Sequence, residues 1–537
     1  MPQRVTVGIE QARASAEQTP RWRGLTRSFA VSALVLAACS KSGGANVEAG
    51  TPPPAEAPRG SARTAGSEAE PVVPSSSLAT AETAREGGIS EALVPGSARP
   101  SLRRGVRLSH GITWYEDDPE AAFAAARASG KRVVVDLWAP WCHTCLSMQS
   151  VVLTADQLPA MSDRFIWLAI DTEREDNAGL LERLPVSVWP TFYVVDAGPA
   201  DATRVEIRGR WLGAASAAQF ARFLTESDAG PASAGPSASD EPVSALAAAD
   251  GLAAQGRNAE AAAAYAALLA RVPREWPRRP ETLVAQMTAL WKARDIDTCL
   301  RVAEASIDET GDSASAVDFS HYALECASQA PANGRGAAVR EAVTRRLEPL
   351  CKLGTRELSP DDRADACDKL AAARTAAGDA DGARQATMAR LAVLERAAFG
   401  KTSEQALTYD WARTDALLQL GRAEEALAIA SERERELPQN YNPPHYRAKS
   451  FKALGRWTEG LAAIERALSL AYGPRKIGLL TLKADLLLGA GRQADAQSTL
   501  REQLVQYRAL PAGQRQPAAE ARVEQRLKSL EAPATAH

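Results

Sequence analysis

Residues 133–145 constrain the fold of this chain more than any other stretch. They begin with Val-Val-Val-Asp-Leu-Trp-Ala, an apolar run that predicts a buried strand, and Pro140 then breaks the run. Cys142 and Cys145 follow, spaced so that a helix starting here carries both thiols within one turn. Thiol–disulfide exchange needs an attacking thiolate and a second thiol that releases the mixed disulfide, so this pair predicts redox chemistry.

The composition limits what can surround this stretch. At 537 residues the chain is too long for one core, so two or more domains are expected. Its 63 basic and 66 acidic residues nearly cancel, and no basic cluster is interleaved with aromatic residues, so we expect no nucleic-acid partner. Only 5% of the residues are aromatic and alanine is abundant, which favours helices packed through small side chains.

Residues 1–38 are typical of a bacterial lipoprotein signal peptide. Arginines precede an apolar run at 29–38 that is too short to span a bilayer. The run ends in Leu-Ala-Ala-Cys, which resembles a lipobox, and this resemblance implies that Cys39 receives a lipid anchor. We expect a lipoprotein of the bacterial cell envelope that faces the periplasm, on the inner or the outer membrane. The alternative is a chance apolar helix in a cytosolic protein.

Residues 39–107 are rich in Ser, Gly, Ala and Pro and poor in large apolar side chains. Such a segment buries too little apolar surface to offset the entropy of folding. It therefore predicts a disordered, lipid-anchored linker.

Residues 108–226 predict an α/β domain in which helix 119–127 precedes an alternating β-α-β-α-β-β-α pattern. The expected elements are strand 132–138, a helix to about 152, strand 165–171, helix 177–184, strands 189–196 and 204–209, and helix 214–226. This is the order of the thioredoxin fold. The segment resembles the thioredoxin superfamily and, most closely, the periplasmic C-terminal domain of bacterial transmembrane disulfide-interchange reductases. The residues that carry the resemblance are Val135–Cys142 with Cys145, Ala169–Asp171, Trp189–Thr191 and Gly209.

The two cysteines have different expected roles. At a helix start, Cys142 is near free backbone N–H groups and the positive end of the helix dipole, which stabilise its thiolate. We expect Cys142 to attack and Cys145 to resolve the mixed disulfide. The alternative, a structural metal site, needs about four ligands, and only His143 lies beside the pair. We expect no metal, and no cofactor other than the redox-active disulfide.

The resemblance also implies roles for residues outside the pair. Asp136 matches a buried acid proposed to take the proton of the resolving thiol, and burial should raise its pKa; the alternative is an ordinary strand-end Asp. Pro190 matches a cis-proline that shapes the groove for the substrate backbone, with a trans turn proline as the alternative. The expected substrate-binding residues are Trp141, Trp189, Pro190 and Thr191. Trp138 and Trp141 flank the pair and fit core packing or recognition equally well.

Three positions leave the direction of electron flow open. Leu146 stands where the reductases often have Lys, and Trp167 stands where many thioredoxins have a basic residue. His143 either stabilises the thiolate electrostatically, which would make the pair more oxidising, or faces solvent. The redox potential of the family therefore cannot be transferred to this chain.

A second linker is expected at 227–242, and residues 243–537 predict an all-α domain. Glycine-led turns recur in it, and those that begin at Gly421, Gly455 and Gly491 are 34 and 36 residues apart. Gly256 begins a similar turn, and Gly378 a looser one. The units resemble tetratricopeptide repeats. We expect six or seven irregular units up to about residue 510, forming a solenoid whose concave face binds a protein or peptide.

The remaining four cysteines all fall in this helical region, where they permit three pairings. Cys299 begins one expected helix and Cys326 ends the next, so an antiparallel hairpin brings them together. Cys351 and Cys367 can meet in the same way. We predict disulfides Cys299–Cys326 and Cys351–Cys367, with reduced packing cysteines as the alternative.

Two functional hypotheses follow. The first is an envelope thiol–disulfide oxidoreductase, by resemblance a reductase, that exchanges disulfides with client proteins recruited by the repeats and takes electrons from a separate membrane protein. An oxidase or isomerase is a variant of this hypothesis. The second is a non-catalytic lipoprotein adaptor or assembly scaffold whose thioredoxin-like domain is a docking module.

Overall fold

The structure is a computed structural model that describes residues 105–198, 205–229, 241–331, 333–515 and 517–531, all within one compact unit, Leu93–His537. The expected signal peptide, the lipidation site Cys39 and the linker up to residue 104 lie outside the described residues. Residues 230–240 of the second linker also lie outside the described residues. The rest of this expected linker is helical, since α4 continues to Ala229 and α5 begins at Glu241.

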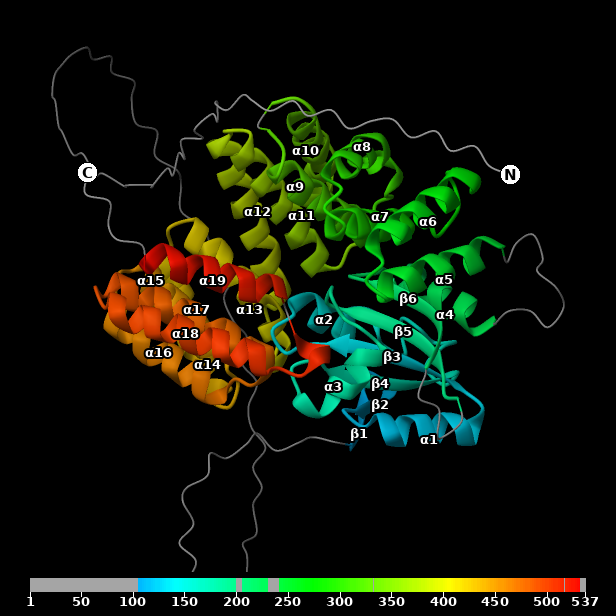
Figure 1. Cartoon of the computed structure of the whole chain (residues 1–537), viewed down its shortest axis with the longest axis horizontal. Coiled ribbons are helices and arrows are strands. Elements are labelled where there is room, and N and C mark those ends of the chain that lie inside the picture. Colours follow the sequence, from blue (N-terminus) through cyan, green and yellow to red (C-terminus); the bar gives the residue numbers. More distant parts are fainter. Residues whose placement is uncertain (1–104, 199–204, 230–240, 332, 516, 532–537) are drawn as a thin grey trace, which may run out of the picture. The chain divides into compact units, whose positions relative to one another are not determined.

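The first part of the described chain is a thioredoxin fold built on one mixed sheet with the strand order β1-β2-β4-β3-β5-β6 (Figure 1). β3 lies inside the sheet, parallel to β4 and antiparallel to β5. The strands are β1 (Gly105–Ser109), β2 (Ile112–Glu116), β3 (Arg132–Trp138), β4 (Phe165–Asp171), β5 (Thr191–Asp196) and β6 (Glu206–Leu212). The β1–β2 hairpin adds two strands before the expected pattern, and its first three residues, 105–107, lie within the expected linker.

Alternation along β3 divides the core of this domain into two layers. Val133, Val135 and Leu137 face a cluster that includes apolar residues of α1 (Pro119–Ser129) and α3 (Ala178–Arg183). Val134 faces the opposite cluster, which includes residues of α4 (Ala217–Ala229). By the same alternation, Asp136 lies on the α4 side of the sheet.

The helix that begins at His143 changes from α-helical to π-helical hydrogen bonding partway along, which the sequence pattern did not predict. α2 spans His143–Ser147 and continues as a π-helical turn, η1, over Met148–Val152. The expected end near residue 152 is therefore correct, but only the first half is α-helical. π-turns inside helices are rare and occur frequently at functional sites.

From residue 241 onward every element of the described chain is a helix, and consecutive helices pack against each other, for example α10 on α11 and α17 on α18 (Figure 1). The helices are α5 (Glu241–Ala254), α6 (Asn258–Arg271), α7 (Arg279–Lys292), α8 (Ile296–Ser306), α9 (Ala314–Ser328), α10 (Arg335–Leu353), α11 (Pro360–Ala376), α12 (Ala380–Ala398), α13 (Ser403–Gln419), α14 (Ala423–Glu436), α15 (Asn442–Ala453), α16 (Trp457–Leu470), α17 (Gly473–Gly489), α18 (Gln493–Ala509) and α19 (Pro517–Glu531), with short 3₁₀ turns η3 (Ile307–Glu309) and η4 (Ala512–Gln514).

The repeated glycines have the conformation that their position requires. Gly256, Gly421, Gly455 and Gly491 each follow the first helix of a hairpin and have φ between +69° and +75°. Residues with a Cβ rarely adopt this left-handed conformation, so glycine allows the chain to reverse here. The fold class is thus the expected one: an α/β thioredoxin fold followed by an α-helical repeat array.

Two disulfides join neighbouring helices of the array. Cys299 of α8 is bonded to Cys326 of α9, and Cys351 of α10 is bonded to Cys367 of α11. These are the two predicted pairings, and all four cysteines are buried.

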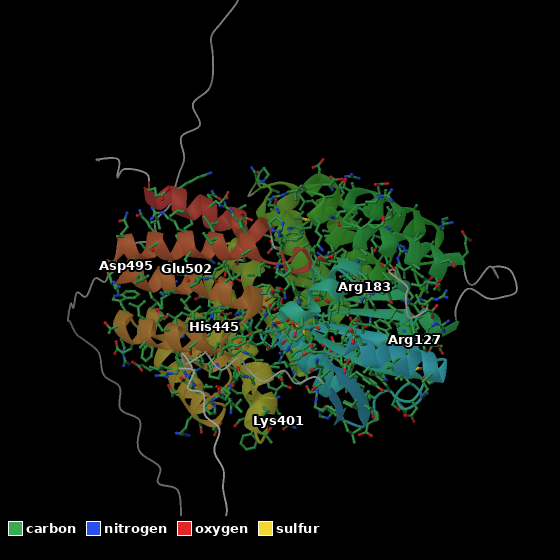
Figure 2. All side chains as sticks on the ribbon, turned by 60° about the horizontal axis from the view of Figure 1, so that its bottom comes forward. Arg127, Arg183, Lys401, His445, Asp495 and Glu502 are labelled. Atoms are coloured by element: carbon green, nitrogen blue, oxygen red, sulfur yellow. A yellow bond between two sulfur atoms is a disulfide. The ribbon has the colours of Figure 1, made fainter. Side chains whose placement is uncertain are left out.

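The surface of the described chain carries charges of both signs. Exposed examples are Arg127, Arg183, Lys401, Asp495 and Glu502 (Figure 2). Of the helices in the described part of the chain, none combines the length and the apolar character needed to cross a bilayer.

Candidate redox site

The redox pair lies where β3 turns into α2. Cys142 is the N-cap residue of α2, and its Sγ accepts a hydrogen bond of 3.0 Å from the backbone N–H of Cys145. The two cysteines form a disulfide. A hydrogen bond donated to sulfur favours the negatively charged form, so this N–H would stabilise a Cys142 thiolate in the reduced protein.

Asp136 lies completely buried in β3, six residues before Cys142. Gln149 donates a hydrogen bond of 2.8 Å to its Oδ2, whereas Oδ1 has no hydrogen-bond partner. Burial raises the pKa of Asp136 to about 7, and the hydrogen bond from Gln149 opposes this shift. This carboxyl can therefore bind or release a proton near neutral pH.

The loop before β5 provides the other wall of the site. The Trp189–Pro190 peptide bond is cis, as the resemblance implied. Thr191 pairs with Leu137 of β3, and its Oγ1 donates a hydrogen bond of 2.6 Å to the carbonyl of Val188.

The tryptophans that flank the pair pack around it. The Trp189 and Trp141 rings lie 5.3 Å apart, and the Trp189 Nε1 donates to Thr172 Oγ1 at 2.9 Å. Trp138, Trp141 and Trp189 pack against the cluster formed by Ala139, Cys142 and Cys145. The structure therefore brings the expected tryptophans to the disulfide.

Two of the positions that leave the redox direction open have structural roles. Trp167 is buried against Trp114 at 5.3 Å, and its Nε1 donates to the carbonyl of Ser162. Leu146, in α2, is partly buried. Neither provides a charged group near the disulfide.

Helices of the array cover residues 139–143, the redox loop, and sequence reasoning missed this contact. Asn442, at the start of α15, donates from its Nδ2 to the carbonyl of Pro140 at 2.9 Å. The Trp141 indole lies between Glu173, to which its Nε1 donates at 2.7 Å, and the guanidinium of Arg475, which is 5.4 Å from the ring centre. Cys142, the expected attacking residue, is only 4% exposed.

A second set of contacts fixes the segment after β4 to α17 and η4. Tyr472 donates to Asp171 Oδ2 at 2.5 Å, and Gln514 Nε2 donates to the carbonyls of Thr172 and Arg174 at 2.9 and 3.0 Å. Gly473, with φ +60°, lies so close to Glu173 that a Cβ would be 2.0 Å from its carbonyl oxygen. No local signal in the sequence indicates these contacts, because each joins segments about 300 residues apart.

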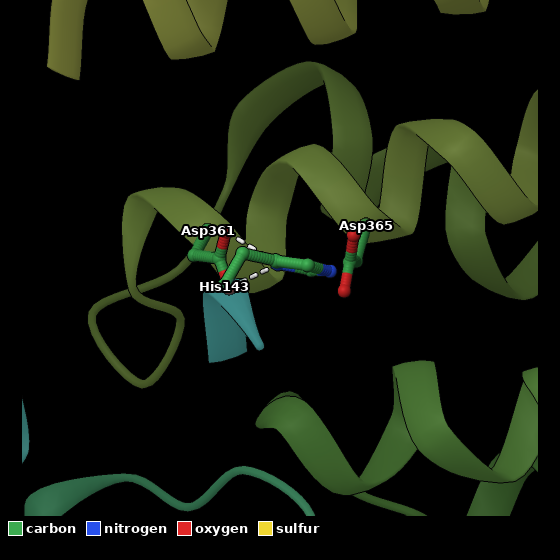
Figure 3. Close-up of side chains that lie close together, drawn as sticks. All are labelled: His143, Asp361 and Asp365. Atoms are coloured by element: carbon green, nitrogen blue, oxygen red, sulfur yellow. Dashed lines mark hydrogen bonds and ion pairs between the residues drawn. The ribbon is translucent and has the colours of Figure 1, made fainter. Parts of the chain in front are cut away.

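His143 joins the redox loop to α11 (Figure 3). Its Nδ1 lies 2.9 Å from Asp361 Oδ2, and its ring stacks on Trp411 at 5.1 Å. Burial lowers the pKa of His143, but the negative charges of Asp361 and Asp365 outweigh this and raise the pKa to about 9. The solvent-facing alternative for His143 is therefore wrong, and the residue is an imidazolium at neutral pH.

His143, Asp361 and Asp365 also form a cluster that could hold a metal ion, because one ligand atom from each lies within 4.8 Å of the others. The cluster already has cations, however. Burial raises the pKa of Asp365, and the positive charges of His143, Lys369 and Arg390 oppose this shift. The residues therefore fit a buried ion-pair network, in which His143 is the cation shared by two carboxylates.

Comparisons with known proteins agree with this geometry. Residues 113–197 match the family model described as thioredoxin-like, so the chain contains a domain of that class. The thiol:disulfide interchange protein DsbD of Pseudoalteromonas atlantica is 28% identical over 110 residues, which is 20% of this chain. The match spans only 19% of the length of that relative.

A tetratricopeptide repeat protein from Parabacteroides merdae is similar in structure to the chain. The match covers 54% of this chain and 98% of that protein, at 12% identity and a TM-score of 0.36.

Proposed function

We propose that this chain is an envelope thiol–disulfide oxidoreductase that acts on client proteins. The observation that carries the proposal is the Cys142–Cys145 disulfide at the start of α2, beside the cis-proline loop of a thioredoxin-like domain. In the reducing direction, the Cys142 thiolate attacks a client disulfide and releases one client thiolate. Cys145 then attacks Cys142 Sγ, releases the second client thiol and forms the Cys142–Cys145 disulfide. Two electrons pass from the chain to the client.

Asp136 is proposed to take the proton from Cys145 before this second attack. Its burial, its unpartnered Oδ1 and its pKa of about 7 support this role, because a general base works best when its pKa lies near the working pH. Trp141, Trp189, Pro190 and Thr191 are proposed to contact the client backbone.

The proposed location is the bacterial envelope, on the periplasmic side of the inner or the outer membrane. The lipobox-like sequence that ends at Cys39 supports a lipid anchor, and the similarity to a thiol:disulfide interchange protein supports the same type of chemistry. We propose the reducing direction, with a separate membrane protein as the electron donor, on the basis of the resemblance to disulfide-interchange proteins.

A scaffold function is the second candidate, because helices of the array contact Pro140, Trp141 and His143 and Cys142 is only 4% exposed. In this case the array binds a protein partner and the thioredoxin-like domain is a docking module. The two candidates differ in whether the thiols are needed.

The test uses the full chain. Purified protein should reduce the disulfides of insulin with dithiothreitol as the electron source, and the Cys142→Ser variant should not. The Cys145→Ser variant should trap a client as a mixed disulfide on Cys142, which mass spectrometry identifies. The enzymatic function would be refuted if wild-type protein reduced insulin no faster than the Cys142→Ser variant. The Cys142→Ser, Cys145→Ser double variant and a chain lacking residues 243–537 should also be expressed in cells from which the gene for this chain has been deleted. The scaffold function would be established if the double variant restored the wild-type phenotype and the truncated chain did not.

A further inference from the structure

A cavity of about 740 Å³ opens between η1 and the helical array. Its walls are formed by η1, the loop between α10 and α11, the end of α12, and α13. Its apolar lining consists of Val151, Leu353, Leu358, Val393, Ala397 and Tyr409. The volume lies within the range of about 300–1,000 Å³ found for ligand pockets, so the cavity is large enough to take part in binding.

Every charged side chain that lines this cavity is basic. The four are Arg356, Arg363, Arg396 and Lys401. Arg363 is held in place, because it donates to the carbonyls of Cys351 and Lys352 at the end of α10. The side chains of the other three are exposed and have no hydrogen-bond or ion-pair partner among the described residues. The neighbouring acids Glu357 and Glu395 are also exposed but do not line the cavity, which therefore presents unpaired positive charge to a ligand.

Two large apolar side chains extend into solvent at the edge of the same cavity. Leu353, which lines it, is 80% exposed, and Phe399, between the lining residues Ala397 and Lys401, is 88% exposed. They are the two most exposed large apolar side chains among the described residues. Grouped apolar side chains that face water in this way mark a surface that meets a protein or a membrane.

The mixture of apolar side chains and unpaired cations favours an anionic bilayer as the partner. At such a surface, apolar groups enter the boundary between headgroups and acyl chains, and lysine and arginine are attracted to the anionic lipids. A small ligand enclosed in the cavity would leave Phe399 in water, because this residue does not line it. A bilayer covers Leu353 and Phe399 together and neutralises the cations beside them.

This surface is fixed to the redox helix by polar contacts. The Oγ atoms of Ser359, in the loop between α10 and α11, and of Ser147, in α2, are 3.2 Å apart. Asp361, two residues further on, binds His143. A membrane bound at this surface would therefore set the orientation of α2 relative to the bilayer.

We propose that Leu353, Arg356, Arg396, Phe399 and Lys401 form a docking face for an anionic membrane surface. Leu353 and Phe399 enter the headgroup region, and the three cations bind lipid phosphates. This docking goes beyond the proposed redox activity and uses other residues, although it rests on the proposed envelope location. It holds the redox domain in one orientation at the bilayer in which the proposed electron donor lies.

The test follows hydrogen exchange of the full-length chain in the presence of vesicles. The readout is local, because an anchor at Cys39 would attach every variant to the vesicles. Vesicles of phosphatidylcholine with about one third phosphatidylglycerol should slow exchange about fivefold at residues 353–359 and 396–402, and pure phosphatidylcholine should not. Equal exchange with the two kinds of vesicle would overturn the proposal. Protection by a soluble peptide of alternating Glu and Phe, but not by vesicles, would overturn it in favour of a protein partner.

Substitutions of exposed residues test the two components of the face. Arg396→Gln with Lys401→Gln, and separately Phe399→Ser, should abolish the fivefold protection. The charge control is Arg127→Gln with Arg183→Gln, because these residues are also exposed and without a partner among the described residues. They lie on a different part of the surface from Lys401 (Figure 2). The apolar control is Val505→Ser, since Val505 is 67% exposed on α18.

Both controls should keep the protection, and an equal loss in the controls would reduce the effect to non-specific attraction and overturn the proposal. Reduction of insulin without vesicles should be unchanged in all of these variants, because none of the residues contacts the disulfide. A chain that reduces insulin but shows no protection by anionic vesicles would overturn the docking face and leave the proposed enzyme intact.

Discussion

The Nδ1 atom of His143 lies 2.9 Å from the carboxylate of Asp361, although 218 residues separate them in the chain. His143 directly follows the expected attacking cysteine, and Asp361 belongs to the first turn of α11. The redox loop is thus joined to the helical array by a buried charged hydrogen bond. The stability of this interface should depend on both groups.

Replacing Asp361 by Asn should destabilise the protein at pH 7. A hydrogen bond to a charged group contributes about 1.5–3 kcal/mol, so we expect a loss of about 2 kcal/mol in the free energy of unfolding. Urea denaturation measures this loss. The control is Asp495→Asn, because Asp495 forms an exposed ion pair with Arg492 that should contribute about 0.5 kcal/mol or less. Equal effects of the two substitutions would contradict the role of the buried pair.

The same pair predicts a loss of stability at alkaline pH. The pKa of His143 is about 9 in the folded protein and about 6.5 in an unfolded chain, so the folded state binds this proton more tightly. The contribution is fully present below pH 6.5 and is lost as the pH rises through about 9. Denaturation of wild type between pH 6 and 10 should show this decrease. In His143→Gln the decrease should be absent, and a persisting decrease would assign it to another group.

Asp136→Asn should raise the stability of the protein at alkaline pH and slow its turnover. The pKa of Asp136 is raised from 3.8 to about 7, so its stabilising contribution is present below pH 3.8 and is lost as the pH rises through about 7. At pH 9 the variant should be more stable than wild type by between about 1 and 4 kcal/mol, because no charge is buried. Cys145 should resolve the mixed disulfide more slowly in the variant. The rate of this step should no longer increase as the pH rises through about 7. Stopped-flow fluorescence of the tryptophans beside the disulfide follows this step.

Gly473→Ala should weaken the contact between α17 and the segment after β4. Its Cβ would overlap the carbonyl of Glu173, and we expect a loss of about 1–3 kcal/mol in the free energy of unfolding. Gly491→Ala is a matched control: Gly491 has φ +74° but open space around its Cβ position, so only the backbone cost of about 1 kcal/mol applies. Hydrogen exchange should detect loosening near Glu173 only in Gly473→Ala. Similar exchange in both variants would mean that the close approach is unimportant.

The disulfides of the array should stabilise it without taking part in turnover. Cys299–Cys326 and Cys351–Cys367 close loops of 27 and 16 residues, and removal of either should cost about 3 kcal/mol. Calorimetry of each Cys→Ala pair measures the loss. Reduction of a peptide disulfide should continue at the wild-type rate, and a pair whose loss stops the reaction would be part of the electron path.

Strands β3 to β6, the redox pair and the disulfides of the array could be predicted because they depend on local patterns. The alternation of Val133, Val134 and Val135 assigns each side chain of β3 to a face of the sheet, and the Cys-x-x-Cys spacing puts both thiols on one helical turn. The disulfide pairings followed from helical hairpins, which bring residues near in sequence together. The cis-proline followed from the resemblance to a known family.

Only the tertiary structure decided what covers this pair. Nothing in the sequence near Asp361, Asn442 or Asp318 distinguishes a side chain that faces solvent from one that binds another domain, because each is an ordinary polar residue on an amphipathic helix. The surface that they meet comes from residues about 100–300 positions earlier, and its shape exists only after both parts have folded. The sequence by itself determined the cysteine pair at the start of α2, because its spacing is local, whereas the packing of the array against the thioredoxin fold determined what covers it.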